Sequence, residues 1–139
     1  MYLVDTDVVS ELRKRDKANR GVARFFSRVA ELDQPLYLSA ITVGELRRGA
    51  EMVRHRGDEA QAGLLERWLT QLIAEHEDAI LSFDHDVATI WGILRVPHHE
   101  NAIDKQIAAT ALVYDLTIVT RNTRHFERTG ARVLDPFDG

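Results

Sequence analysis

The chain has 139 residues, with 18 Lys and Arg against 22 Asp and Glu, so its formal net charge is −4 at pH 7, a balance that argues against unspecific wrapping of nucleic acid. It contains no cysteine, which excludes disulfides, thiolate zinc sites and cysteine nucleophiles. The length fits one compact domain, and because the acidic N-terminus lacks a long apolar run we expect no signal peptide, no membrane span and a cytoplasmic location.

The first half of the chain alternates short apolar runs with segments of helical periodicity. In chain order, the pattern predicts a strand over residues 2–4, helices over 8–15 and 21–32, a strand over 36–38, and helices over 42–55 and 59–76. Thr6 or Asp7 is expected to cap the first helix, since both residue types favour helix starts. The last of these helices is long and amphipathic, and its apolar surface exceeds what one small domain covers, so we expect a homodimer.

The second half repeats the same alternation. It is predicted to contain a strand over residues 79–83, helices over 86–95 and 104–114, a strand over 117–119, a short helix or turn over 122–128, and a strand over 132–134. Asp84 or Asp86 is expected to cap the helix that Pro97 ends. Strands that alternate with helices indicate an α/β fold, in which a parallel sheet lies between helices in a single domain.

Four polar residues follow predicted strands or begin the helices beside them. Asp5 comes directly after the first strand, Glu45 lies one turn into the helix after the second, and Asp104 begins a helix. Asn122 follows the 117–119 strand within three residues. Because ligands of open α/β sheets bind beyond the carboxyl ends of the strands, we expect these four side chains to meet at one end of the sheet.

Three carboxylates in one cleft would repel each other unless a cation neutralises them. Carboxylate and amide oxygens are hard ligands that suit Mg²⁺ or Mn²⁺, and such a metal can activate water and stabilise charge on a phosphodiester. Each residue also has a simpler interpretation. Asp5, Asp7 and Asp104 are good helix caps, Glu45 could be a solvated helix residue, and Asn122 is a common turn residue. The hypothesis therefore depends on their joint placement.

Four segments carry a resemblance to a known family. They are LVDTDVVSEL, YLSAITVGELRRGA, DKQIAATALVYDLTIVTRNTRHF and VLDPF, in this order along the chain. Together they resemble the PIN-domain toxins of the VapC or FitB type, which belong to bacterial type II toxin–antitoxin pairs. The resemblance covers essentially the full length, so residues 1–139 are expected to form one PIN domain with a parallel sheet between helices.

The resemblance implies roles for the candidate residues. Asp5 and Asp104 resemble the principal metal ligands, and Glu45 the third acidic residue, which helps bind metal and place water. The fourth position, often Asp in the family, is Asn122 here and carries no charge. The implied reaction is Mg²⁺-dependent hydrolysis of RNA, with Mn²⁺ as a substitute, that leaves 5′-phosphate and 3′-hydroxyl ends. The implied partner is an antitoxin of the VapB or FitA type that blocks the cleft.

Several further residues near the proposed cleft have two interpretations. Thr6 and Thr120 resemble residues that position ligands or water, although hydroxyl side chains also cap local turns. Arginines near the cleft could contact RNA phosphates or form surface ion pairs, and these are Arg47, Arg48, Arg121 and Arg124.

Three other functions are weaker hypotheses. LVDTDVV and IVTRN also fit a haloacid-dehalogenase-like phosphatase, but no lysine and no second acidic motif of that type follow Asn122. A catalytically silent PIN-fold binding module would not need the intact acidic set. His98-His99-Glu100 could suggest zinc, yet adjacent histidines point apart and no third ligand follows at a useful spacing.

Overall fold

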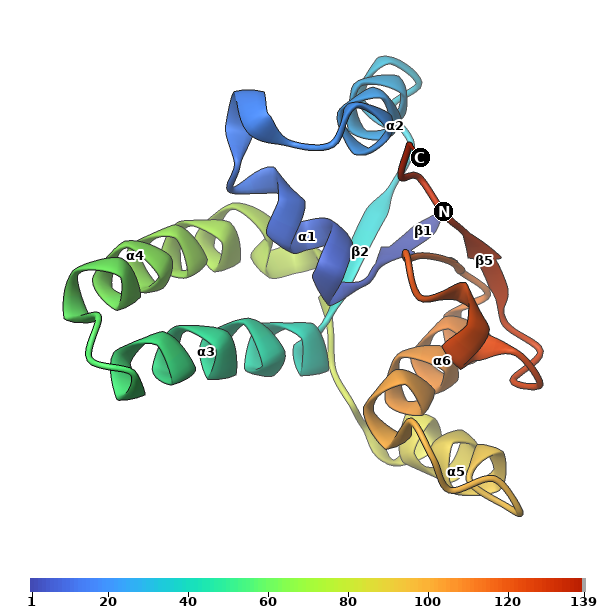
Figure 1. Ribbon diagram of the computed structural model, residues 1–139. Coiled ribbons are helices and arrows are strands. Elements are labelled where there is room, and N and C mark those ends of the chain that lie inside the picture. The colour runs from blue at the N-terminus through green and yellow to red at the C-terminus, as the bar shows by residue number, and fades with distance from the viewer. Residues whose placement is uncertain (139) are drawn as a thin grey trace.

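The computed structural model describes residues 1–138 and contains a five-stranded, all-parallel sheet in the order β3-β2-β1-β4-β5 (Figure 1). The strands are β1 (Tyr2–Val4), β2 (Leu36–Ser39), β3 (Ile80–Leu81), β4 (Thr117–Val119) and β5 (Arg132–Leu134). The predicted α/β/α class is therefore confirmed, and β1 lies in the centre of the sheet. In the pairing of β1 with β4, Val4 is opposite Val119, so the residues after both strands emerge side by side.

Six α-helices and three 3₁₀ segments of the described part of the chain connect the strands. The helices are α1 (Thr6–Leu12), α2 (Arg20–Glu31), α3 (Ala40–His55), α4 (Glu59–His76), α5 (His85–Leu94) and α6 (Ala102–Tyr114). The 3₁₀ segments are η1 (Arg15–Lys17), η2 (Glu77–Ala79) and η3 (Thr123–Phe126). No helix among residues 1–138 is long and apolar enough to cross a membrane.

Side-chain alternation along the strands divides the core into two layers, one on each face of the sheet. One layer packs the sheet against α1, α2 and α4, and its buried members are Val4, Val8, Val9, Val22, Leu38, Leu69, Leu72 and Val119. The other packs it against α6 and η3, and its buried members are Leu3, Ile107, Ala108, Ala111, Leu116, Ile118 and Phe126. Neighbouring residues of one strand, such as Leu3 and Val4, thus stabilise opposite faces.

The expectation that Thr6 or Asp7 caps the first helix is wrong, and the simpler interpretation of Asp5 as a helix cap is confirmed. Asp5 is the N-cap of α1, and its Oδ1 accepts a hydrogen bond from the Thr6 N–H at 2.8 Å. The helix therefore begins at Thr6 and ends at Leu12, instead of spanning residues 8–15. The other helix boundaries agree within a few residues, and Asp84, one of two predicted alternatives, caps α5 with a bond from the Val87 N–H.

Helices α3 and α4 pack against each other as a hairpin that extends from the sheet (Figure 1). Arg54 of α3 reaches three acidic side chains, with Glu51 at 2.6 Å, Glu59 at 3.0 Å and Glu66 as a further ion-pair partner. Arg47 pairs with Glu51 at 3.1 Å. Charges of opposite sign thus alternate across this hairpin, hereafter called the arm.

The end of the chain folds back onto the start of α2. Asn19 binds Asp138 through two hydrogen bonds, donating to its carbonyl at 3.1 Å and accepting from its N–H at 3.0 Å. Gly21 permits this approach, because a Cβ at this position would lie 2.1 Å from the Pro136 carbonyl oxygen. The contact brings Phe137 under the Arg121 guanidinium, 4.7 Å from the ring centre.

Candidate active site

Asp5 and Thr120 follow the central strands β1 and β4 and lie in contact at their carboxyl ends. The Asp5 N–H donates to the Val119 carbonyl at 2.9 Å, and the Thr120 hydroxyl donates to Asp5 Oδ2 at 2.8 Å. The Thr120 hydroxyl in turn accepts from the Asn122 N–H at 3.0 Å. Asp5 is only 5% exposed, so strand pairing holds its carboxylate in a buried, fixed position.

Asp7 lies in the first turn of α1 and faces the same region. Its Oδ2 accepts a hydrogen bond from the Arg121 N–H at 3.0 Å. Its Oδ1 is buried and has no hydrogen-bond partner among residues 1–138. Buried polar atoms normally have a partner, so this oxygen is available to a bound group.

Asp104 lies in the first turn of α6, and its carboxylate is partly exposed. Asn101, the N-cap of α6, adopts a left-handed conformation and makes no side-chain cap bond, so Asp104 is not the cap. Instead, Asp104 Oδ2 contacts His125 Nδ1 of η3 at 2.7 Å. This contact between residues 21 positions apart fixes Asp104 relative to the turn after β4.

Burial and neighbouring acidic groups disfavour the charged forms of Asp5 and Asp7. Burial raises the pKa of Asp5 from its ordinary value of 3.8 to about 6, and the nearby charges of Asp7 and Asp104 add to this rise against the bonds from Thr120 and Thr6. Burial likewise raises the pKa of Asp7, with contributions from Asp104 and Asp135. Neither Asp5 nor Asp7 forms an ion pair within residues 1–138. Within the described residues, Asp5 and Asp7 are therefore acidic groups without a cationic side chain to balance them, whereas Asp104 contacts His125.

The predicted site residues are brought together only in part. Asp104 lies close enough to Asp5 to contribute to its raised pKa, and Asn122 joins the site through its backbone, while its side chain is exposed. Glu45 is half-buried in α3 and forms no hydrogen bond or ion pair with another described residue. Its role in the site remains a prediction.

Sequence reasoning missed two members of this region. Asp7 was taken as a helix cap, but Asp5 occupies that position and leaves Asp7 free to face the site. The spacing of Asp5 and Asp7 did offer a signal, since both follow the strand that pairs centrally. His125 gave no such signal, because its contact with Asp104 depends on how η3 packs against α6.

The chemistry of the donor set fits a hard divalent cation, although the ligands are not fully assembled. No three Asp, Glu, His or Cys side chains in residues 1–138 form a ready group of metal ligands. Two observations nevertheless favour a cation here, namely the raised pKa of buried Asp5 and the unpartnered oxygen of Asp7. Only oxygen atoms face this position from the three aspartates, which suits Mg²⁺ or Mn²⁺.

Comparison with known proteins places this geometry in context. Residues 2–132 match the family described as PIN domain. The chain is 35% identical to "Toxin FitB" of Neisseria gonorrhoeae and 32% identical to "VapC ribonuclease Y4jK" of Sinorhizobium fredii, in each case over 99% of both chains. It also resembles the crystal structure of FitAcB from Neisseria gonorrhoeae, with a TM-score of 0.76, 35% identity and 98% of both chains covered.

Proposed function

The chain belongs to the PIN-domain family, and from that premise we propose that it is the toxin of a toxin–antitoxin pair and a Mg²⁺-dependent endoribonuclease. The names of its relatives, a toxin and a ribonuclease, support this proposal. The observation that carries it is the buried carboxylate of Asp5, whose pKa rises to about 6 beside Asp7 and Asp104. A bound cation would neutralise this carboxylate and remove the cost of ionising it.

Asp5 and Asp104 are proposed to hold the cation, with Glu45 as a third acidic group and Asn122 at the edge of the site. When bound, the metal would activate water and neutralise charge on the phosphodiester. Mn²⁺ is expected to substitute, because it prefers the same oxygen ligands. The family resemblance predicts products with 5′-phosphate and 3′-hydroxyl ends.

The chain's own residues orient these ligands. The Thr120 hydroxyl and the Thr6 N–H each bind one oxygen of Asp5, which fixes the plane of its carboxylate. His125 holds Asp104 in the same way through Oδ2. Partners of this kind fix the orientation of metal ligands, so Thr120 and His125 are positioning residues of the proposed site.

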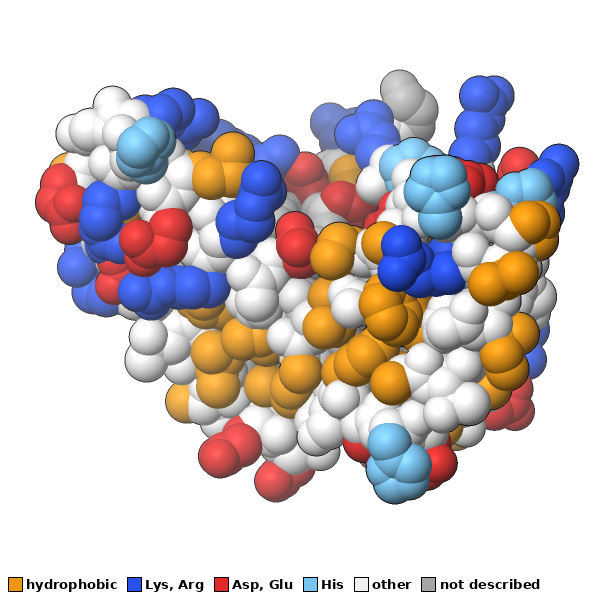
Figure 2. All heavy atoms as spheres, turned by 90° about the horizontal axis from the view of Figure 1, so that it is seen from below, with side chains coloured by type: hydrophobic (Ala, Val, Ile, Leu, Met, Phe, Trp, Pro, Cys, Tyr) orange, Lys and Arg blue, Asp and Glu red, His pale blue; other side chains and the backbone are white. Residues whose placement is uncertain are grey.

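An antitoxin of the VapB or FitA type is the proposed partner, since the similar solved structure is described as FitAcB. Self-association is proposed as well, because the arm exposes large apolar side chains, with Met52 47% and Leu64 55% exposed. Figure 2 shows further hydrophobic side chains gathered in the centre of the underside, with charged groups around them. Sedimentation at micromolar concentration tests the dimer, and a monomer would contradict it.

The nuclease is tested by incubating the purified chain with RNA in EDTA, and then with added Mg²⁺ or Mn²⁺. Cleavage is expected only with metal, and Asp104→Asn should abolish it while the circular dichroism spectrum stays unchanged. Metal-independent cleavage, or full activity of Asp104→Asn, would refute the mechanism. If the chain were a PIN fold that only binds a partner, Asp104→Asn would inhibit growth as strongly as the wild type. Loss of growth inhibition in Asp104→Asn therefore distinguishes the nuclease from such a binding module.

A further inference from the structure

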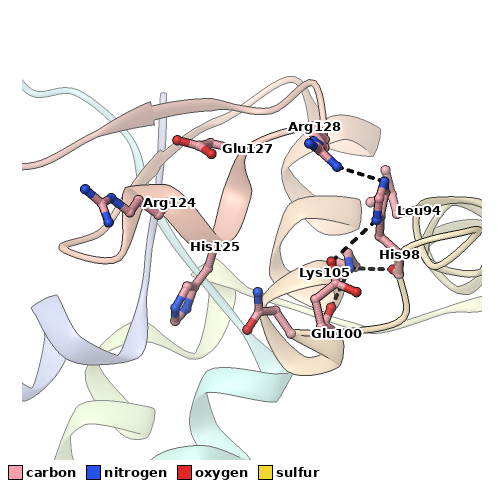
Figure 3. A pocket seen from close by; sticks show the side chains of 9 residues that line it. Leu94, His98, Glu100, Lys105, Arg124, His125, Glu127 and Arg128 are labelled. Carbon is pink, nitrogen blue, oxygen red and sulfur yellow. Dashed lines mark hydrogen bonds and ion pairs between the residues drawn. The ribbon is translucent and has the colours of Figure 1, made fainter.

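A cavity of about 200 Å³ lies next to the acidic site, on the far side of His125. It is formed by the loop before α6, by the first turns of α6 and by η3 and the residues after it. Its walls carry Lys105, Arg124, Arg128, His98 and His125. In Figure 3, Arg124 and His125 lie on one side, and Lys105, His98 and Arg128 on the other. His125 lines this cavity and also contacts Asp104.

Lys105 is the unusual member of the cavity, because it is only 5% exposed. Its ammonium donates to the carbonyl oxygens of His98 and Glu100, and no carboxylate among residues 1–138 pairs with it. An ammonium has three N–H donors, so one remains without a partner in the described part of the chain. The Glu100 carboxylate is close enough to interact with the charge of Lys105 but forms no ion pair with it, so the buried ammonium can still favour a bound anion.

The two arginines also lack acidic partners within residues 1–138. Arg128 donates to His98 Nε2 at 3.0 Å, which requires that nitrogen of His98 to be an unprotonated acceptor. Glu100 lies beside His98 Nδ1 at 3.6 Å, and Glu127 also lines the cavity. Three permanent cations therefore face two carboxylates, and the cationic groups keep free donors.

We propose that this cavity binds a phosphodiester group of the RNA substrate, adjacent to the one cleaved at the acidic site. Guanidinium and ammonium groups are the usual donors to phosphate oxygens, and the volume accommodates one such group. The proposal deepens the proposed nuclease function and rests on it. It assigns Arg124, Arg128 and Lys105 to substrate positioning, because His125 both lines the cavity and contacts Asp104 of the acidic site.

Arg124→Gln and Arg128→Gln carry the test, because both side chains are exposed and Lys105 also holds the loop before α6. The matched control is Arg15→Gln, since Arg15 and Arg128 are both exposed arginines with positive φ, 52° and 68° respectively. Binding of a short single-stranded RNA is measured by fluorescence anisotropy in EDTA, where no cleavage is expected. This readout does not depend on nuclease activity.

Each cavity variant is expected to weaken RNA binding by about tenfold and to reduce the slope of log Kd against log salt by about 0.7. Arg15→Gln should bind like the wild type. A series of RNAs is then tested, each with one phosphodiester linkage replaced by a neutral methylphosphonate. The wild type should bind one member of the series more weakly than the others, and the variant that combines Arg124→Gln with Arg128→Gln should bind all members equally.

Equal RNA binding by the wild type and both cavity variants would overturn the proposal, as would an equal loss in Arg15→Gln. Variants that keep RNA affinity but lose the protein partner would assign the cavity to acidic groups of that partner instead. The failure of the proposed function looks different, because a wild type that binds RNA at this cavity but never cleaves it would refute the nuclease and leave the phosphate site standing.

Discussion

The arm and the acidic site both concentrate charge, but they do so in opposite ways. On the arm, Arg54 lies among Glu51, Glu59 and Glu66, and its hydrogen bond is the main cause of a lowered pKa of Glu51. At the acidic site, burial and like charges raise the pKa of Asp5 to about 6. The ion pairs of the arm thus favour the ionised form of Glu51, whereas burial at the acidic site disfavours the ionised form of Asp5.

This difference separates a structural role from a functional one. Ion pairs at a partly exposed helix interface cost little desolvation and add little stability. A buried group of like charges lowers stability unless something else neutralises it, and such groups cluster at functional sites. Removing charge should therefore have different consequences in the two regions, for activity as well as for stability.

The largest effect is expected from Asp5→Asn. This substitution keeps the shape of the side chain and its cap on α1, but it removes the charge that would hold the cation. Cleavage of RNA should fall by roughly 10³-fold or more, as for other residues that touch the reacting groups. Arg54→Gln on the arm is the control and should cleave RNA like the wild type. Equal losses of cleavage in both variants would contradict the assignment of a functional role to the acidic site alone.

Glu45→Gln is expected to have an intermediate effect, because Glu45 forms no hydrogen bond or ion pair with the three aspartates in the described structure. We predict a loss of about 10- to 100-fold in kcat/KM, together with a higher Mg²⁺ concentration for half-maximal activity. Titration of the cleavage rate with Mg²⁺ measures both. An unchanged rate and an unchanged Mg²⁺ requirement would show that Glu45 is not part of the active site.

Asp5 also predicts how the stability of the metal-free protein depends on pH. Between pH 3.8 and about 6 the folded carboxyl keeps its proton while the unfolded one loses it, so the free energy of unfolding falls as pH rises through this window. The total fall is on the order of 3 kcal/mol. Urea unfolding in EDTA at a series of pH values measures it.

Asp5→Asn provides the control for this pH dependence. The variant should lose most of the slope and be more stable than the wild type above pH 6, where the wild-type carboxylate is ionised at a cost. Added Mg²⁺ at neutral pH should raise the Tm of the wild type more than that of the variant. A wild type that is more stable than Asp5→Asn in EDTA at neutral pH would show that ionised Asp5 does not destabilise the folded state.

Much of the fold and part of the acidic site were predictable from the sequence, because they depend on local patterns. Apolar periodicity predicted the alternating strands and helices, and the rule that ligands bind beyond parallel strands selected Asp5 and Asp104. The cap of α1 was not predictable in the same way. Both Asp5 and Asp7 suit a helix start, and the choice depends on where pairing of Val4 with Val119 ends the strand.

Contacts between distant segments escaped the sequence altogether. The burial of Lys105 requires the loop before α6 to present two carbonyl groups, and no residue pattern signals this. The pair formed by Asp104 and His125 similarly depends on how η3 packs against α6. Glu45 was placed correctly on its helix, but the sequence could not decide how close it lies to the aspartates.

The smallest effect is expected from Arg54→Gln, which tests the arm's side of the comparison. The variant should show a small decrease in Tm at low salt, because three partly exposed ion pairs are lost and none is fully desolvated. In about 1 M NaCl the difference from the wild type should shrink, since the screening length falls to about 3 Å. Thermal scans at both salt concentrations measure this. If the decrease were large and independent of salt, Arg54 would act through packing between α3 and α4, and the arm would owe its stability to burial in the same way as the core.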